Sequence, residues 1–116
     1  MLRVTYHVGE GFTSEGSPID GDTALKYRHA AMLQAASLFG GFTAHGTDGG
    51  WADPQGNLIT EPSWQLSVYT ADTEHASAFG QFLRDLFRQT SVYMAVDSVV
   101  LTELDANGSV RLSASA

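Results

Sequence analysis

Apolar and polar residues alternate at the start of the chain. Every second residue from Leu2 to Val8 is apolar, and the positions between them carry Arg, Thr or His. A period of two places the apolar side chains on one face of a β-strand. Residues 9–22 are rich in Gly, Ser and Pro, which is typical of a loop. We therefore expect a strand with one buried face, followed by an irregular connection.

Two later segments have the spacing of amphipathic helices. The first runs from an N-cap at Asp22 or Thr23 to about Leu38, before two glycines that suit a left-handed helix end. Its predicted buried stripe is Leu25, Arg28, Met32, Ala35, Ala36 and Phe39, widened by Ala24, Ala31 and Leu38. The second is capped by Asp72 and runs to about Gln89, with a stripe of Ala76, Phe79, Leu83, Leu86 and Phe87. Gly80 costs this helix about 1 kcal/mol relative to Ala, and we expect it to allow close packing against a sheet.

Two strands are predicted between these helices, from Phe42 to Trp51 and from Leu58 to Tyr69. The sequence ADPQGN joins them as a hairpin loop, with Pro54 and Gly56 at turn positions. Pro62 lacks an N–H group, so a bulge or irregularity is expected there. A last strand is predicted from about Val92 to Leu104, and residues 105–116 read as a tail or a short edge strand at 110–112.

The order of elements is strand, helix, strand, strand, helix, strand. Two split βαβ units with right-handed crossovers form a ferredoxin-like βαββαβ sandwich. This predicts an α+β fold, with a four-stranded antiparallel sheet and two helices on one face. A length of 116 residues suits a single domain spanning 1–116.

Charge and composition exclude several classes of partner. The net charge of −7 repels phosphate backbones, and no basic run offsets it, so direct nucleic-acid binding is not expected. The absence of cysteine excludes disulfides and thiolate metal sites. No segment has membrane-spanning length and no apolar leader is visible, so a cytoplasmic location without membrane attachment is expected.

The uncovered face of the predicted sheet carries polar and aromatic residues with few charges. Its expected members are Thr5, His7, Thr43, His45, Glu61, Ser63, Gln65, Ser67 and Tyr69, with Tyr93 or Asp97. RNA stacking on this face is excluded because basic residues do not surround the aromatics. The remaining alternatives are packing on a second subunit and a pocket between two subunits. A homo-oligomer is therefore expected, with a dimer as the first choice.

Candidate chemistry on this face is limited. His7, His45 and Glu61 suit a divalent metal chemically, but their spacing forms no local motif, and isolated side chains are the simpler interpretation. The glycine-rich stretch GTDGGWADPQGN lacks the lysine of a phosphate loop and precedes no helix, which favours a hairpin with Trp51 as its anchor. The alternative is a ligand rim in which the glycines allow close backbone approach and Trp51 stacks on a planar ligand. No catalytic residue, metal ligand or cofactor is predicted. The predicted ligand-binding residues are His7, Thr43, His45, Trp51, Glu61, Ser63, Gln65 and Tyr69.

Three segments resemble a known family. They are GGFTAHGTDGGW, DPQGNLITEPSWQLSV and FRQTSVYMAV, which together cover about Gly40 to Val96. In this order they resemble an uncharacterised family of small ferredoxin-like bacterial and phage proteins. The matching positions are Thr43, Trp51, Glu61, Ser63 and Gln89. The resemblance implies the same fold and carries no established reaction.

These observations favour a non-enzymatic binding protein. In this hypothesis a homo-oligomer holds a small polar or nucleotide-like ligand at the open sheet face, as a phage or mobile-element protein that sequesters such a molecule would do. One alternative is an acidic inhibitor that binds a protein partner, such as a host defence or nucleic-acid enzyme. Another is a small dimeric α/β-barrel enzyme that uses His7, His45 or Glu61 as acid and base.

Overall fold

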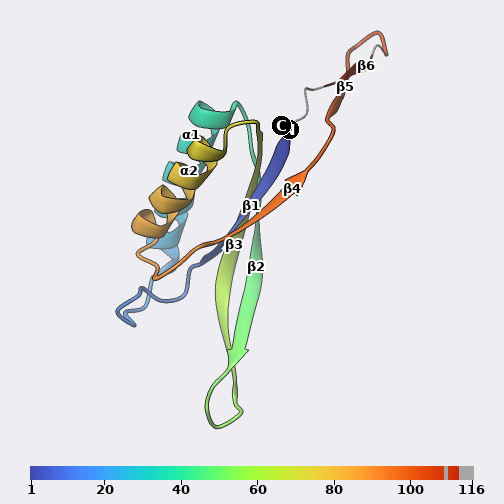
Figure 1. Ribbon diagram of the computed structural model, residues 1–116. Coiled ribbons are helices and arrows are strands. Elements are labelled where there is room, and N and C mark those ends of the chain that lie inside the picture. Colours follow the sequence, from blue (N-terminus) through green and yellow to red (C-terminus); the bar gives the residue numbers. More distant parts are fainter. Residues whose placement is uncertain (109, 113–116) are drawn as a thin grey trace.

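The computed structural model describes residues 1–108 and 110–112 and confirms the predicted fold class (Figure 1). A four-stranded antiparallel sheet has the order β2-β3-β1-β4, and α1 and α2 lie side by side on one of its faces. The elements are β1 (Leu2–Gly9), α1 (Gly21–Phe39), β2 (Thr43–Ala52), β3 (Leu58–Thr70), α2 (Thr73–Leu86), β4 (Tyr93–Ser98), β5 (Thr102–Leu104) and β6 (Val110–Leu112). No helix in these described ranges is long and apolar enough to cross a membrane.

The core lies between the helices and the sheet, where the alternation placed it. On β1, Val4, Tyr6 and Val8 are fully buried, and on β3 the residues that alternate with the predicted outward positions, Trp64, Leu66 and Val68, are also buried. From α2, Ala76, Phe79, Leu83 and Phe87 complete the cluster. The Tyr6 hydroxyl donates a buried hydrogen bond of 2.6 Å to the Ala76 carbonyl, and burial raises the pKa of this phenol. Gly80 lies against the Tyr6 ring, as its predicted packing role requires.

The first helix differs from the prediction in its cap and its buried face. Asp20 caps it and accepts a 2.8 Å hydrogen bond from the Thr23 N–H, so neither Asp22 nor Thr23 is the N-cap. Leu25 is 60% exposed, because it lies six residues before buried Ala31 and therefore about 120° around the helix from it. Ala36 and Leu38 are also exposed. The predicted Ala31 and Ala35 are buried and the predicted Met32 and Phe39 pack against the core, as does Tyr27, which was not in the predicted stripe.

The second helix keeps its predicted cap, because Asp72 accepts a 3.0 Å hydrogen bond from the His75 N–H. It ends at Leu86, three residues before the expected end at Gln89. Arg88 then adopts a positive φ of 55°, which takes the chain out of the helix. Gln89 consequently lies in the α2–β4 connection.

The bulge expected at Pro62 is absent. The pairing of β2 with β3 runs without interruption from Thr47↔Ser63 to Gly49↔Glu61. The Pro62 carbonyl accepts a 2.9 Å hydrogen bond from Glu10, on the β1 side of the strand. In an antiparallel ladder the N–H and C=O of one residue point to the same neighbour. The missing N–H of Pro62 therefore falls where β1 has ended, and the ladder to β2 loses nothing.

The expected last strand is divided. β4 ends at Ser98, and the final bond to β1 is Val99 N–H to the Met1 carbonyl at 3.0 Å. Beyond this point β1 offers no further partner, so the chain leaves the sheet. β5 then pairs with β6 in a separate two-stranded sheet that extends away from the domain (Figure 1), instead of adding an edge strand. Residues 109 and 113–116 of the expected tail lie outside the described residues.

Candidate functional site

A cavity of about 480 Å³ lies at one end of the open sheet face, beneath two loops. The strands supply its floor, the loop after β1 and the α2–β4 connection supply its walls, and the β2–β3 hairpin contributes its rim. The lining residues are His7, Gly9, Phe12, Thr13, Ser14, Gly16, Trp51, Glu61, Gln89, Thr90, Ser91 and Tyr93. Three segments that are distant in sequence therefore meet at one cavity.

The loop after β1 is held by its own hydrogen bonds. Thr13 N–H donates to the Ser17 carbonyl at 2.8 Å, and Ile19 N–H donates to the Gly11 carbonyl at 2.9 Å. Ser14 N–H donates to the Arg88 carbonyl at 2.7 Å, which joins this loop to the α2–β4 connection. The two walls of the cavity are thus tied together by backbone contacts.

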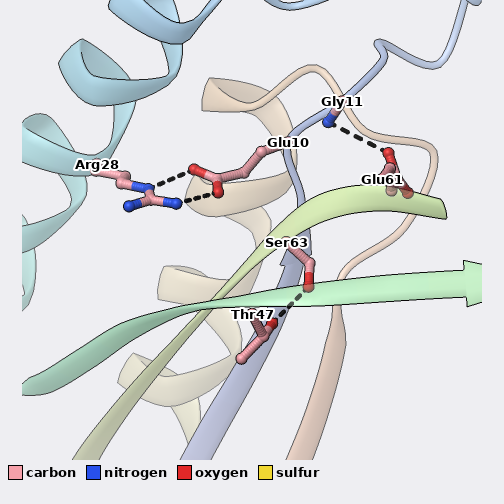
Figure 2. Close-up of polar contacts among 6 residues, drawn as sticks. All are labelled: Glu10, Gly11, Arg28, Thr47, Glu61 and Ser63. Carbon is pink, nitrogen blue, oxygen red and sulfur yellow. Dashed lines mark hydrogen bonds and ion pairs between the residues drawn. The ribbon is translucent and has the colours of Figure 1, made fainter.

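Glu61 lies on β3, beside the loop that follows β1. Its Oε2 atom accepts a 3.2 Å hydrogen bond from the Gly11 N–H (Figure 2). A Cβ atom at Gly11 would lie only 2.8 Å from the Glu61 Cβ, which is too close for any side chain there. The glycine lets the loop backbone approach the carboxylate and hold one of its two oxygens.

Gln89 joins the α2–β4 connection to the loop after β1. Its Nε2 atom donates to the Phe12 carbonyl at 2.8 Å and to the Phe87 carbonyl at 2.9 Å. Gln89 was absent from the predicted ligand-binding set, although it was one of the positions matched by the family resemblance. Phe12 was also missed as a cavity residue, because nothing in its local pattern indicates which loops fold over the sheet. Tyr93 was expected on the open face but was not in the predicted ligand-binding set.

A buried ion pair supports this loop from the helix side. Glu10 is only 2% exposed, and both of its carboxylate oxygens accept hydrogen bonds from Arg28 of α1, from Nε at 2.6 Å and from Nη2 (Figure 2). The carboxylate raises the pKa of the Arg28 guanidinium, which also lies 5.8 Å from the Trp64 ring. Sequence reasoning missed Glu10, although an arginine on the predicted buried stripe signals a carboxylate partner.

The predicted ligand-binding residues share the open face but lie in different places on it. His7, Trp51 and Glu61 line the cavity. Thr43 and Tyr69 line a second hollow of about 290 Å³ near the end of α1. The remaining three lie along the face: His45 and Gln65 are in the same cross-strand row as His7, and Ser63 makes a 2.5 Å hydrogen bond with the Thr47 hydroxyl (Figure 2).

The structure does not support the metal-site alternative. His7 and His45 belong to strands on opposite sides of β3, so about 10 Å separates their backbones. In residues 1–108 and 110–112 no three His, Cys, Asp or Glu side chains are placed to hold a metal ion.

The charge of the cavity is set by Glu61. None of its lining residues is Lys or Arg, and three of them, Phe12, Trp51 and Tyr93, are aromatic side chains with substantial exposure, at 43%, 48% and 74%. Exposed aromatic rings can stack on planar ligands, whereas a carboxylate favours cations and hydrogen-bond donors. The site is therefore suited to a planar ligand that is neutral or positively charged.

Comparisons with known proteins support the fold. No protein-family model and no curated sequence matches the chain. A phage SAM lyase in complex with S-methyl-5'-thioadenosine is similar in structure, with a TM-score of 0.58 and 19% identity over 83% of this chain and 79% of that chain. The phage SAM lyase in its apo state has a TM-score of 0.57 and 19% identity, over 83% of this chain and 78% of that chain. CutA from Synechococcus elongatus PCC7942 has a TM-score of 0.50 and 19% identity, over 82% of this chain and 73% of that chain.

Proposed function

We propose that this protein binds a small, neutral or cationic nucleoside in the cavity at the end of its open sheet face. The observation that carries the proposal is a cavity of about 480 Å³ that combines exposed aromatic rings with one carboxylate. This volume lies within the range of small-molecule sites, which is about 300–1,000 Å³. The similar structure of a phage SAM lyase holds a nucleoside thioether, S-methyl-5'-thioadenosine, which supports this ligand class.

The charge of the site narrows the earlier expectation of a nucleotide-like ligand. Phosphate groups are normally held by Arg, Lys or helix N-terminal N–H groups. The cavity lining contains none of these cations, it includes Glu61, and the chain carries a net charge of −7. A nucleoside without phosphate fits this environment better than a nucleotide does.

The proposal includes a homo-oligomer, with a dimer as the first choice. An isolated two-stranded sheet is only marginally stable in water. The β5–β6 sheet stands apart from the main sheet and exposes Leu104 and Val110 at 68% and 61%. Val100, in the segment between β4 and β5, is 66% exposed. Leu58, at the end of the β2–β3 hairpin, is 74% exposed. Contact with a second copy of the chain would cover these apolar side chains.

Titration calorimetry with S-methyl-5'-thioadenosine and adenosine monophosphate tests the binding proposal. We expect the thioether nucleoside to bind more tightly than the phosphate compound. Trp51→Ala should weaken nucleoside binding about tenfold, since base–aromatic stacking contributes about 1–3 kcal/mol. Tyr69→Ala is the matched control, because Tyr69 is similarly exposed but lines the second hollow. The proposal would be contradicted if the oligomeric protein bound no nucleoside. It would also be contradicted if Trp51→Ala and Tyr69→Ala lost equal amounts of nucleoside affinity.

A second candidate function is an enzyme that acts on such a nucleoside. It is favoured by the position of His7 and Glu61 in one cavity, whereas His45 lies outside the cavity. The test is chromatography for S-methyl-5'-thioadenosine released from SAM, with Glu61→Gln as the variant. Turnover that is lost in this variant would favour the enzyme, and no release by the wild-type protein would favour the binding protein.

Other expectations stay predictions. They are the acidic inhibitor of a host enzyme, a sequestering role in a phage or mobile element, membership of the uncharacterised family, and a cytoplasmic location. Oligomer size is measured by analytical ultracentrifugation, and a monomer at high concentration would count against the homo-oligomer.

A further inference from the structure

Two side-chain oxygen atoms converge over Gly9 in the floor of the cavity. A Cβ atom at this glycine would lie 3.0 Å from Glu61 Oε1 and 3.1 Å from Gln89 Oε1. Glu61 comes from β3 and Gln89 from the α2–β4 connection, so the convergence is produced by the tertiary fold. The absence of a side chain at Gly9 leaves the space between the two oxygens open.

The remaining polar atoms of both side chains already have partners. Glu61 Oε2 accepts the Gly11 N–H, and Gln89 Nε2 donates to two backbone carbonyls. A flipped Gln89 amide would place its oxygen against those two carbonyl oxygens, so the network assigns Oε1 to the side of Gly9. Among the described residues no donor is recorded for Glu61 Oε1 or Gln89 Oε1.

We propose that Glu61 Oε1 and Gln89 Oε1 form an acceptor pair that selects ligands carrying a primary ammonium group. An ammonium group has three donors and a positive charge, so it satisfies both acceptors and neutralises the carboxylate. No lysine or arginine lines the cavity, so no cationic side chain of the lining donates to these two acceptors or neutralises the carboxylate. The inference rests on the proposed nucleoside function and deepens it: the preferred ligand is a nucleoside that bears a primary ammonium group.

Two nucleoside thioethers separate this inference from the proposed function. S-(3-aminopropyl)-5'-thioadenosine carries a primary ammonium group and no carboxylate, whereas S-methyl-5'-thioadenosine carries neither. Calorimetry on the full chain should show tighter binding of S-(3-aminopropyl)-5'-thioadenosine than of S-methyl-5'-thioadenosine to the wild-type protein. Glu61→Gln should weaken binding of the ammonium compound at least about tenfold more than binding of S-methyl-5'-thioadenosine, since hydrogen bonds to charged groups are strong. Gly9→Ala should have the same selective effect because its methyl group fills the space between the oxygens.

Ser63→Ala is the matched control. Ser63 lies two residues from Glu61 on the same face of β3, but its hydroxyl contacts Thr47 and it does not line the cavity. Thermal melts verify that each variant folds. Similar affinity of the wild-type protein for the two compounds, or equal losses for both in Glu61→Gln, would overturn the ammonium proposal while leaving nucleoside binding intact. No binding of either compound would overturn both proposals.

Discussion

The Glu10–Arg28 ion pair predicts that substituting one partner lowers the free energy of unfolding more than substituting the other. The Glu10 side chain is 1% exposed, whereas the Arg28 side chain keeps 27% of its surface exposed. Arg28→Met leaves a buried carboxylate without its cation, and breaking a buried pair in this way costs about 3–5 kcal/mol. Glu10→Gln leaves a guanidinium that still reaches water, with a neutral acceptor beside it. We expect this second change to cost about 1–2 kcal/mol of unfolding free energy.

Urea denaturation of both single variants and the double variant measures these values and their coupling. The surface pair of Arg3 and Asp97, joined at 3.1 Å with side chains 46% and 53% exposed, provides the comparison. Arg3→Met should cost less than about 1 kcal/mol, as exposed pairs usually contribute little. If Arg28→Met were no more destabilising than Arg3→Met, the argument from burial would be wrong. The same would follow if Glu10→Gln were the costlier of the two single changes.

Three further predictions concern the core, a helix cap and the cavity. Phe79→Ala should lower the free energy of unfolding by about 3–5 kcal/mol in urea melts, because the Phe79 ring is buried and its centroid lies 5.1 Å from that of the Tyr6 ring. A loss below about 1 kcal/mol would contradict this prediction. The hydrogen bond from the His75 N–H lowers the pKa of Asp72 below its ordinary 3.8. The ionised Asp72 therefore stabilises the fold above pH 3.8, and this contribution is lost as the pH falls through the lowered pKa. Asp72→Asn keeps the cap but should flatten the acid dependence of stability, and an unchanged pH profile would refute the assignment. Gly11→Ala should displace Glu61 and weaken binding of S-(3-aminopropyl)-5'-thioadenosine, whereas Gly21→Ala, which meets open space, should leave that binding unchanged in the same calorimetry.

The alternation on β1 and β3 was sufficient to predict which face each residue occupies. Side chains along a strand point alternately to opposite faces, so Trp64 and Ser63 had to lie on opposite sides once the strand was recognised. The helix with the clearer apolar stripe, α2, was also predicted well in its cap and its buried residues. The alanine-rich α1 was predicted less well, because several stripes of small residues compete around one helix and only packing selects among them.

The sequence by itself determined the order of the elements, the two faces of the sheet and most of the core, because these follow from periodicities within short segments. It also indicated that polar residues of the open face would lie together. The tertiary structure alone decided that Glu61 and Gln89 converge over Gly9, that Glu10 pairs with Arg28, and that β4 ends where β1 offers no further partner. Each of these depends on how distant segments meet in space, and such contacts leave no periodic signal along the chain.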